Sequence, residues 1–147
     1  MKNEILGSSK ELFISQNGVN EIIMQPQLKI DSKGIQEDKF YDRDVNRSIL
    51  ITSVLAYDLL KKHNISANYG SLGENLLVNF DPYNVPKGTK ISIAEVVLEI
   101  TNECTICDHL NKINTKVPDL LKNNRGVFAK VIQGGIISIN DSIKLLK

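Results

Sequence analysis

Short runs of alternating or continuous hydrophobic residues, bounded by turn-forming residues, recur along most of this chain. The pattern predicts β-strands at residues 11–15, 19–25, 47–52, 76–80, 90–101, 127–133, 136–139 and 142–146. Many short strands separated by turns are typical of a β-barrel whose neighbouring strands run mostly antiparallel. We therefore expect a mainly β fold, built as a closed or nearly closed barrel.

Turn signals indicate how some of these strands connect. Asn17-Gly18 separates the first two runs, and both residues tolerate positive φ, which favours a hairpin. Gly134-Gly135 separates the runs at 127–133 and 136–139 and predicts another hairpin. Within residues 90–101 the alternation is interrupted near Ala94-Glu95, where a turn or a bulge would fit.

One segment, residues 53–63, has the pattern of a helix. Ser53 is suited to the N-cap, Leu55 and Leu59 are four residues apart, and the basic end at residues 61–63 suits the helix C-terminus. A place at the helix C-terminus accounts for the presence of His63, so no chemical role is needed for it. A shorter helix is predicted over residues 118–122, with proline at its first position.

Composition and charge exclude several classes of protein. The chain is 147 residues long, 41% hydrophobic and 24% charged, as expected for one globular domain spanning residues 1–147. A formal net charge of +1 and the lack of a basic run give no support for nucleic-acid binding. No hydrophobic run has the length of a membrane span, and the first residues lack the core of a signal peptide. We expect a cytoplasmic protein that does not bind membranes.

Cys104 and Cys107 are the two cysteines of the chain, and they follow an alternating run. Such a thiol pair can ligate a metal, hold a sulfur atom or exchange electrons. A structural zinc site needs four ligands, and His63 and His109 are the two histidines, with His109 too close to Cys107 for a usual zinc finger. No βαβ pattern supports a thioredoxin-like dithiol. The alternative that both cysteines are small buried residues stays open.

Polar residues at positions 73–75 precede the predicted strand at residues 76–80. Glu74 and Asn75 would place a carboxylate and an amide at the mouth of this strand, and Gly73 would allow close backbone approach. The same residues are also compatible with a simple turn in which Asn75 bonds its own backbone. Sequence alone leaves both interpretations in place.

Two arginines stand at the starts of predicted strands. Arg47 precedes the run at residues 49–51, and Arg125 precedes Gly126. A guanidinium in such a place can bind a phosphate or a carboxylate with two parallel hydrogen bonds. Each arginine could equally form a surface ion pair, in the case of Arg47 with Asp42 or Asp44.

Taken in order, these motifs resemble the MOSC domain, a module named for its occurrence at the C-terminus of molybdenum-cofactor sulfurases. The resemblance runs from about residue 9 to the end of the chain. It rests on Gly-Ile-x-x-Asp at residues 34–38, the strand that follows Arg47, the capped helix, Gly-Glu-Asn-Leu at 73–76, Leu-Glu-Ile-Thr at 98–101, and Arg-Gly-Val-Phe-Ala-Lys-Val at 125–131.

The resemblance implies a barrel-like fold and a cysteine that carries transferred sulfur or ligates the molybdenum of the molybdenum cofactor (molybdopterin). The context of the cysteines is similar to that in the amidoxime-reducing branch, where the second cysteine is the metal ligand. It therefore implies Cys107 as the catalytic and metal-binding thiol, with Cys104 as a neighbour or resolving thiol. The implied cofactor-binding residues are Arg47, Gly73, Glu74, Asn75 and Arg125. We expect Cys107, Asn75 and at least one arginine on the same rim.

The chain departs from the family pattern at some positions. Lys39-Phe40 stands where the family often has a histidine two residues after its aspartate. An aminotransferase-like domain with a pyridoxal-phosphate lysine is lacking, so pyridoxal phosphate is not expected. The function implied is support for the reduction of N-hydroxylated compounds or for the sulfuration of a metal centre. The partners implied are molybdopterin, a sulfur donor or acceptor protein, and a second copy of the chain in a homodimer. The alternative is a non-catalytic binding or assembly module with structural cysteines.

Overall fold

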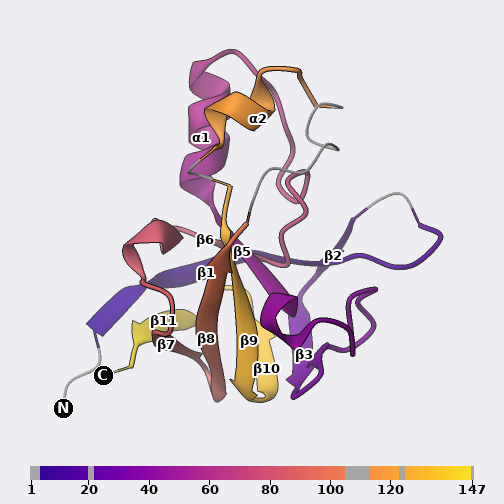
Figure 1. Ribbon diagram of the computed structural model, residues 1–147, viewed down its shortest axis with the longest axis vertical. Coiled ribbons are helices and arrows are strands. Elements are labelled where there is room, and N and C mark those ends of the chain that lie inside the picture. Colours follow the sequence, from indigo (N-terminus) through magenta and orange to yellow (C-terminus); the bar gives the residue numbers. More distant parts are fainter. Residues whose placement is uncertain (1–3, 20–21, 105–112, 123–124, 147) are drawn as a thin grey trace.

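The computed structural model describes residues 4–19, 22–104, 113–122 and 125–146 (Figure 1). The strands are β1 (Glu4–Ile14), β2 (Ile23–Gln25), β3 (Gln27–Asp31), β4 (Gly34–Ile35), β5 (Ile49–Ser53), β6 (Leu76–Val78), β7 (Lys90–Ile93), β8 (Val96–Glu103), β9 (Val127–Gln133), β10 (Gly135–Ser138) and β11 (Ser142–Leu145). The helices are α1 (Val54–Lys62) and α2 (Val117–Leu120), with 3-10 turns η1 (Val45–Arg47) and η2 (Pro82–Asn84). The fold is mainly β, as the sequence predicts.

Seven strands close into a barrel in the order β11-β7-β8-β9-β5-β6-β1, and β1 pairs back with β11. All neighbours in this ring run antiparallel except β5 and β6, which run parallel. A parallel pair needs a crossover connection, and here the crossover contains α1. β2 extends the sheet beyond β1, and β10, β3 and β4 form a small second sheet. The predicted barrel is therefore confirmed, with one parallel pair added.

Aliphatic side chains fill the barrel, because one face of each strand points inward. Along β8, Val96, Leu98 and Ile100 are buried, whereas Val97 and Glu99 between them are only half-buried. This alternation with a period of two is what the sequence shows, and it fixes the register of β8 against its neighbours.

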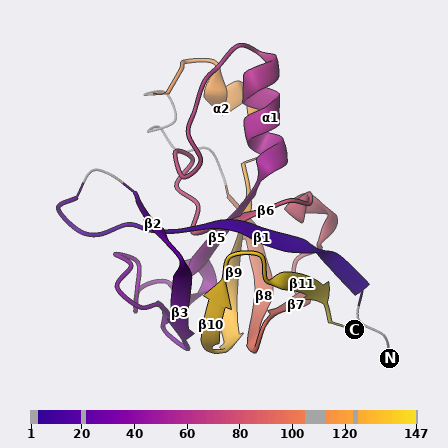
Figure 2. The same ribbon diagram turned by 180° about the vertical axis from the view of Figure 1, so that it is seen from behind.

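A helical cap covers one end of the barrel (Figures 1 and 2). The Ser53 hydroxyl accepts the Leu55 N–H at 3.0 Å and starts α1, and His63 ends it, as the sequence predicts. α2 is shorter than predicted and has Pro118 in its first turn. Buried residues of both helices share one cluster with Leu77 of the barrel. Within the described segments, no helix has the length and apolar character needed to span a membrane.

Two of the predicted turns are confirmed and one is wrong. β1 pairs with β2 across Asn17-Gly18, and β7 pairs with β8 across Ala94-Glu95. Gly134-Gly135 does not join a hairpin, because β10 pairs with β3. β9 pairs with β8 as far as Gln133 and with β5 only over residues 127–129, and the chain then leaves the barrel wall at Gly134 to join β3. A Cβ at Gly134 would lie 2.5 Å from the Ile30 carbonyl oxygen, so glycine permits this close crossing.

Candidate functional site

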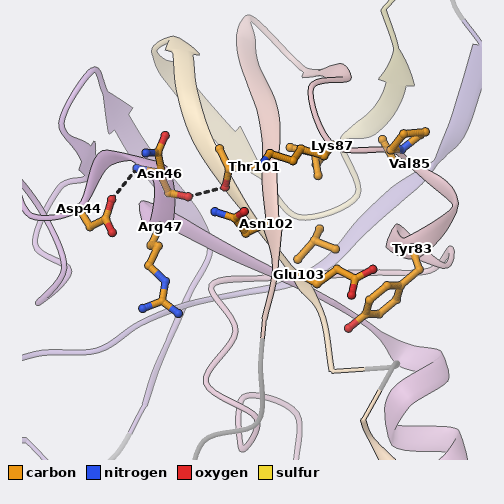
Figure 3. Close-up of a pocket in the computed structure, with 12 residues that line it drawn as sticks. Asp44, Asn46, Arg47, Tyr83, Val85, Lys87, Thr101, Asn102 and Glu103 are labelled. Atoms are coloured by element: carbon orange, nitrogen blue, oxygen red, sulfur yellow. Dashed lines mark hydrogen bonds between the residues drawn. The ribbon is translucent and has the colours of Figure 1, made fainter.

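A pocket of about 680 Å³ opens over the barrel core beside β8 and η1 (Figure 3). Its apolar lining includes Val85, Ile100 and Val127, which belong to the buried core. Its polar lining consists of Asp44, Asn46, Arg47, Tyr83, Lys87, Thr101, Asn102 and Glu103. An apolar floor with a few polar groups around it is the usual composition of a small-molecule site.

A β-bulge in β8 shapes one wall of the pocket. Ile100 pairs with Ala129 and Glu103 pairs with Val127, so β8 contains one residue more than β9 over this interval. The bulge brings three successive residues, 101–103, to the pocket. The Thr101 hydroxyl donates to the Asn46 carbonyl, which ties the bulge to η1.

Arg47 lies at the end of η1 and lines the pocket. Its guanidinium carbon is 4.7 Å from the centre of the Phe128 ring, an arrangement that restrains the planar group. Asp44 caps η1 by accepting the Asn46 N–H at 3.1 Å. Among the described residues the one ion pair is Lys130–Glu99, at 3.5 Å, so the ion pair of Arg47 with Asp44 or Asp42 does not form. The exposed guanidinium edge can therefore meet an anion.

Asn75 is buried and binds the backbone of two strands. Its Oδ1 accepts the Leu50 N–H at 3.0 Å, and its Nδ2 donates to the Phe13 carbonyl at 3.2 Å. Nδ2 also lies 3.3 Å from a carboxylate oxygen of Asp38, whose pKa is raised by burial. These contacts join β5 to β1, and Asn75 does not line the pocket.

Glu74 is fully buried between the barrel and the helical cap. Its carboxylate accepts the Tyr57 hydroxyl at 2.6 Å and the Gly70 N–H at 3.0 Å. Burial raises the pKa of Glu74, and the nearby Arg125 guanidinium acts in the opposite direction. Burial and the neighbouring carboxylate also raise the pKa of Tyr57. Glu74 thus fastens the loop before β6, in which Gly73 adopts a φ of 87°.

Arg125 is also buried, with 2% of its surface exposed. Its Nη2 donates to the Leu72 carbonyl at 2.8 Å, and its own carbonyl accepts the Thr52 hydroxyl at 2.8 Å. Arg125 therefore connects the loop before β6 and the end of β5 to the start of β9. The structure brings Arg125 close to Glu74, but it places both in the interior, away from the pocket that Arg47 lines.

The first cysteine lies at the exit of β8. Cys104 is buried, and its N–H donates to the Gly126 carbonyl at 2.8 Å. Burial raises the pKa of Tyr83, and Glu103 and Cys104 raise it further, which places Tyr83 close to both. Cys107 and His109 lie outside the described residues, so a common rim for Cys107 and its expected neighbours stays a prediction.

Comparison with known proteins assigns the family. A family model described as the MOSC domain matches residues 38–144. The chain belongs to the MOSC family. The MOSC domain described here has the fold of the YuaD protein from Bacillus subtilis, with a TM-score of 0.83 at 17% identity over 98% of this chain and 97% of that chain. No curated protein matches.

Two further solved structures share the fold of this MOSC domain. YiiM from Escherichia coli matches with a TM-score of 0.67 at 17% identity over 94% of this chain and 70% of that one. YiiM from Geobacillus stearothermophilus matches with a TM-score of 0.66 at 11% identity over 99% and 76%. At such identities the likeness shows the fold alone. The MOSC family is associated with the molybdenum cofactor.

Sequence reasoning missed most residues that line the pocket of this MOSC domain. Tyr83 follows Asp81-Pro82, a turn signal that could have drawn attention to it. Thr101 and Glu103 carry no such signal, because the bulge depends on how β8 pairs with β9. Among the described residues, no three or more His, Cys, Asp or Glu side chains are arranged to hold a metal ion.

Proposed function

We propose that this MOSC domain binds the molybdenum cofactor, or carries sulfur on Cys107, at the pocket of Figure 3. One observation carries the proposal. The pocket that holds the exposed Arg47 guanidinium is walled by the end of β8, the strand that leads directly into the Cys-x-x-Cys segment. The Arg47 guanidinium and the strand end that precedes the two cysteines thus line the same pocket.

The residues of the pocket fit a phosphate-bearing heterocycle. The Arg47 guanidinium can donate two parallel hydrogen bonds to a phosphate. The amides of Asn46 and Asn102 can pair with the donor and acceptor edges of a planar ring, above the apolar floor. When bound, the cofactor supplies a metal that already carries its own dithiolene sulfur. A single protein thiolate then suffices as a further soft ligand, so no multi-residue metal cluster is needed.

We assign the thiol role to Cys107 and a supporting role to its neighbour. Cys107 follows Cys104 by three residues, which span at most about 11 Å of chain. In the sulfur-carrying version, a donor persulfide passes its terminal sulfur to the Cys107 thiolate and leaves as a thiolate, so no external oxidant is required. Glu74, Asn75 and Arg125 support this site from the interior, by holding β1, β5, β6 and β9 in place.

The test is to purify the protein without oxygen from cells that make the cofactor. Molybdenum is measured by mass spectrometry, pterin by fluorescence, and added sulfur on Cys107 by peptide mass. We expect either molybdenum with pterin, or one extra sulfur atom on Cys107, and we expect Cys107→Ser to abolish the metal or the sulfur. Finding none of the three in the wild type would contradict the proposal.

An arginine pair provides a matched comparison for the pocket. Arg47→Ser should lower pterin occupancy by about tenfold, because one charge-assisted hydrogen bond contributes about 1.5 kcal/mol or more. Arg43→Ser should leave occupancy unchanged, because Arg43 is exposed and does not line the pocket. If cofactor and sulfur are lacking and Cys107→Ser retains every cellular function, the domain is instead a non-catalytic binding module with structural cysteines.

A further inference from the structure

Tyr83 links the pocket to the strand exit that carries the cysteines. It comes from η2, where the Asp81 carboxylate accepts the Tyr83 N–H at 2.9 Å. Its ring lines the pocket on the side of Glu103, across from Arg47 (Figure 3). Its hydroxyl donates to the Gly126 carbonyl at 3.1 Å and accepts the Gly126 N–H at 3.1 Å. One hydroxyl thus holds both polar backbone groups of a single residue.

Gly126 is the point at which several segments meet. Its carbonyl accepts the Cys104 N–H as well as the Tyr83 hydroxyl. Its φ is 151°, and a Cβ at this position would lie 2.4 Å from the Ile51 carbonyl oxygen. Gly126 is therefore packed tightly against β5. Its contact with the Cys104 backbone lies directly beyond the end of β8.

We propose that Tyr83 is a positioning residue for Cys104, the first residue of the Cys-x-x-Cys segment. Its hydroxyl fixes Gly126, and Gly126 fixes the backbone of Cys104 at the start of that segment. A ligand that presses on the Tyr83 ring in the pocket is thereby coupled to the exposure of Cys104. The meaning of this coupling rests on the proposed function, but the hydrogen-bond chain itself does not.

Removal of the Tyr83 hydroxyl tests the inference. In Tyr83→Phe the ring remains and the two hydrogen bonds to Gly126 are lost. We expect hydrogen exchange of the Cys104 amide and alkylation of its thiol by iodoacetamide to become roughly tenfold faster, because a net hydrogen bond of this kind corresponds to about that factor. Both rates are measured by mass spectrometry of the peptide that contains Cys104.

Tyr41→Phe is the matched control, because it also removes a hydroxyl hydrogen bond. The Tyr41 hydroxyl donates to Asp31 at 2.5 Å, at the β3–β4 turn. This variant should leave both Cys104 rates within twofold of wild type. If Tyr83 only packed against its surroundings, Tyr83→Phe would also behave like the wild type, and that result would overturn the inference.

A further variant covers the case in which Tyr83→Phe does not fold. Asp81→Ala removes the cap of η2 and loosens the turn that carries Tyr83, while leaving the hydroxyl in place. It should also speed exchange at Cys104, and faster exchange in every barrel strand would instead show general destabilisation and contradict the inference. These measurements need neither molybdenum nor pterin. The exchange and alkylation experiments therefore remain valid if the wild type binds no cofactor. Conversely, unchanged rates at Cys104 would overturn the role of Tyr83 without contradicting the proposed function.

Discussion

Glu74 holds a carboxylate in the interior, where the Tyr57 hydroxyl and the Gly70 N–H are its partners. Burial raises its pKa above the ordinary value of 4.5. Above pH 4.5 the unfolded chain has therefore lost a proton that the folded protein still holds. The free energy of unfolding of the wild type, relative to Glu74→Gln, should fall as the pH rises through this window, by at most about 1.4 kcal/mol per pH unit.

Urea denaturation of both proteins between pH 4 and pH 8 measures this difference. Glu37→Gln is the control, because Glu37 is exposed. The free energy of unfolding of Glu37→Gln should differ from that of the wild type by the same amount at every pH between 4 and 8. A difference between wild type and Glu74→Gln that stays constant with pH would show that Glu74 titrates equally in both states.

Gly126 provides a second prediction for a single residue. In Gly126→Ala the new Cβ would lie within 2.4 Å of the Ile51 carbonyl oxygen, in a strand that cannot move without opening the barrel. We expect a loss of about 3 kcal/mol or more in the free energy of unfolding. Gly18→Ala is the comparison, because Gly18 has a φ of 79° but open space around it, and should cost about 1 kcal/mol. Equal losses in the two variants would contradict the clash.

The position of α1 depends on local signals, and these can be tested individually. Ser53→Ala removes the acceptor for the Leu55 N–H and should lower the free energy of unfolding by about 1 kcal/mol. Ser66→Ala, at an exposed serine outside the helix, should change it by less than about 0.5 kcal/mol. Thermal or chemical denaturation distinguishes the two. A neutral Ser53→Ala would mean that packing of α1 alone determines its start.

The sequence predicted those elements whose signals are local. The caps of α1 and the alternation in β8 depend on neighbouring residues, so both could be recognised. The pairing of β10 could not, because its partner β3 lies far away in the sequence and no local signal links the two strands. Likewise, Glu74 and Asn75 were expected at the mouth of a strand, with Asn75 on the rim, because they directly precede the hydrophobic run at residues 76–80. Sequence gives the chemistry of such residues but not their burial, which depends on Tyr57, Asp38 and β1.

At the scale of the whole molecule, closure of the barrel predicts its pattern of local stability. Each barrel strand has a partner on both edges, whereas β2 pairs only with β1 within the described sheets. Hydrogen exchange should therefore show the barrel strands opening together with the highest protection, and β2 exchanging much faster. Exchange in β2 as slow as in β8 would indicate that something covers its outer edge.

The bulge in β8 makes the pocket depend on chain length as well as on side-chain identity. Successive side chains along a strand point to opposite faces of the sheet. The extra residue between Ile100 and Glu103 shifts this alternation by one position, so that Glu103 lies on the same face as Ile100 although the two are three residues apart. Deletion of Asn102 would restore strict alternation, with Thr101 alone opposite Phe128 and Glu103 still opposite Val127. The pocket would then keep the Glu103 carboxylate but lose the Asn102 amide and the extra length of its wall. A relative with one residue fewer at this place would present a different wall, however similar its composition.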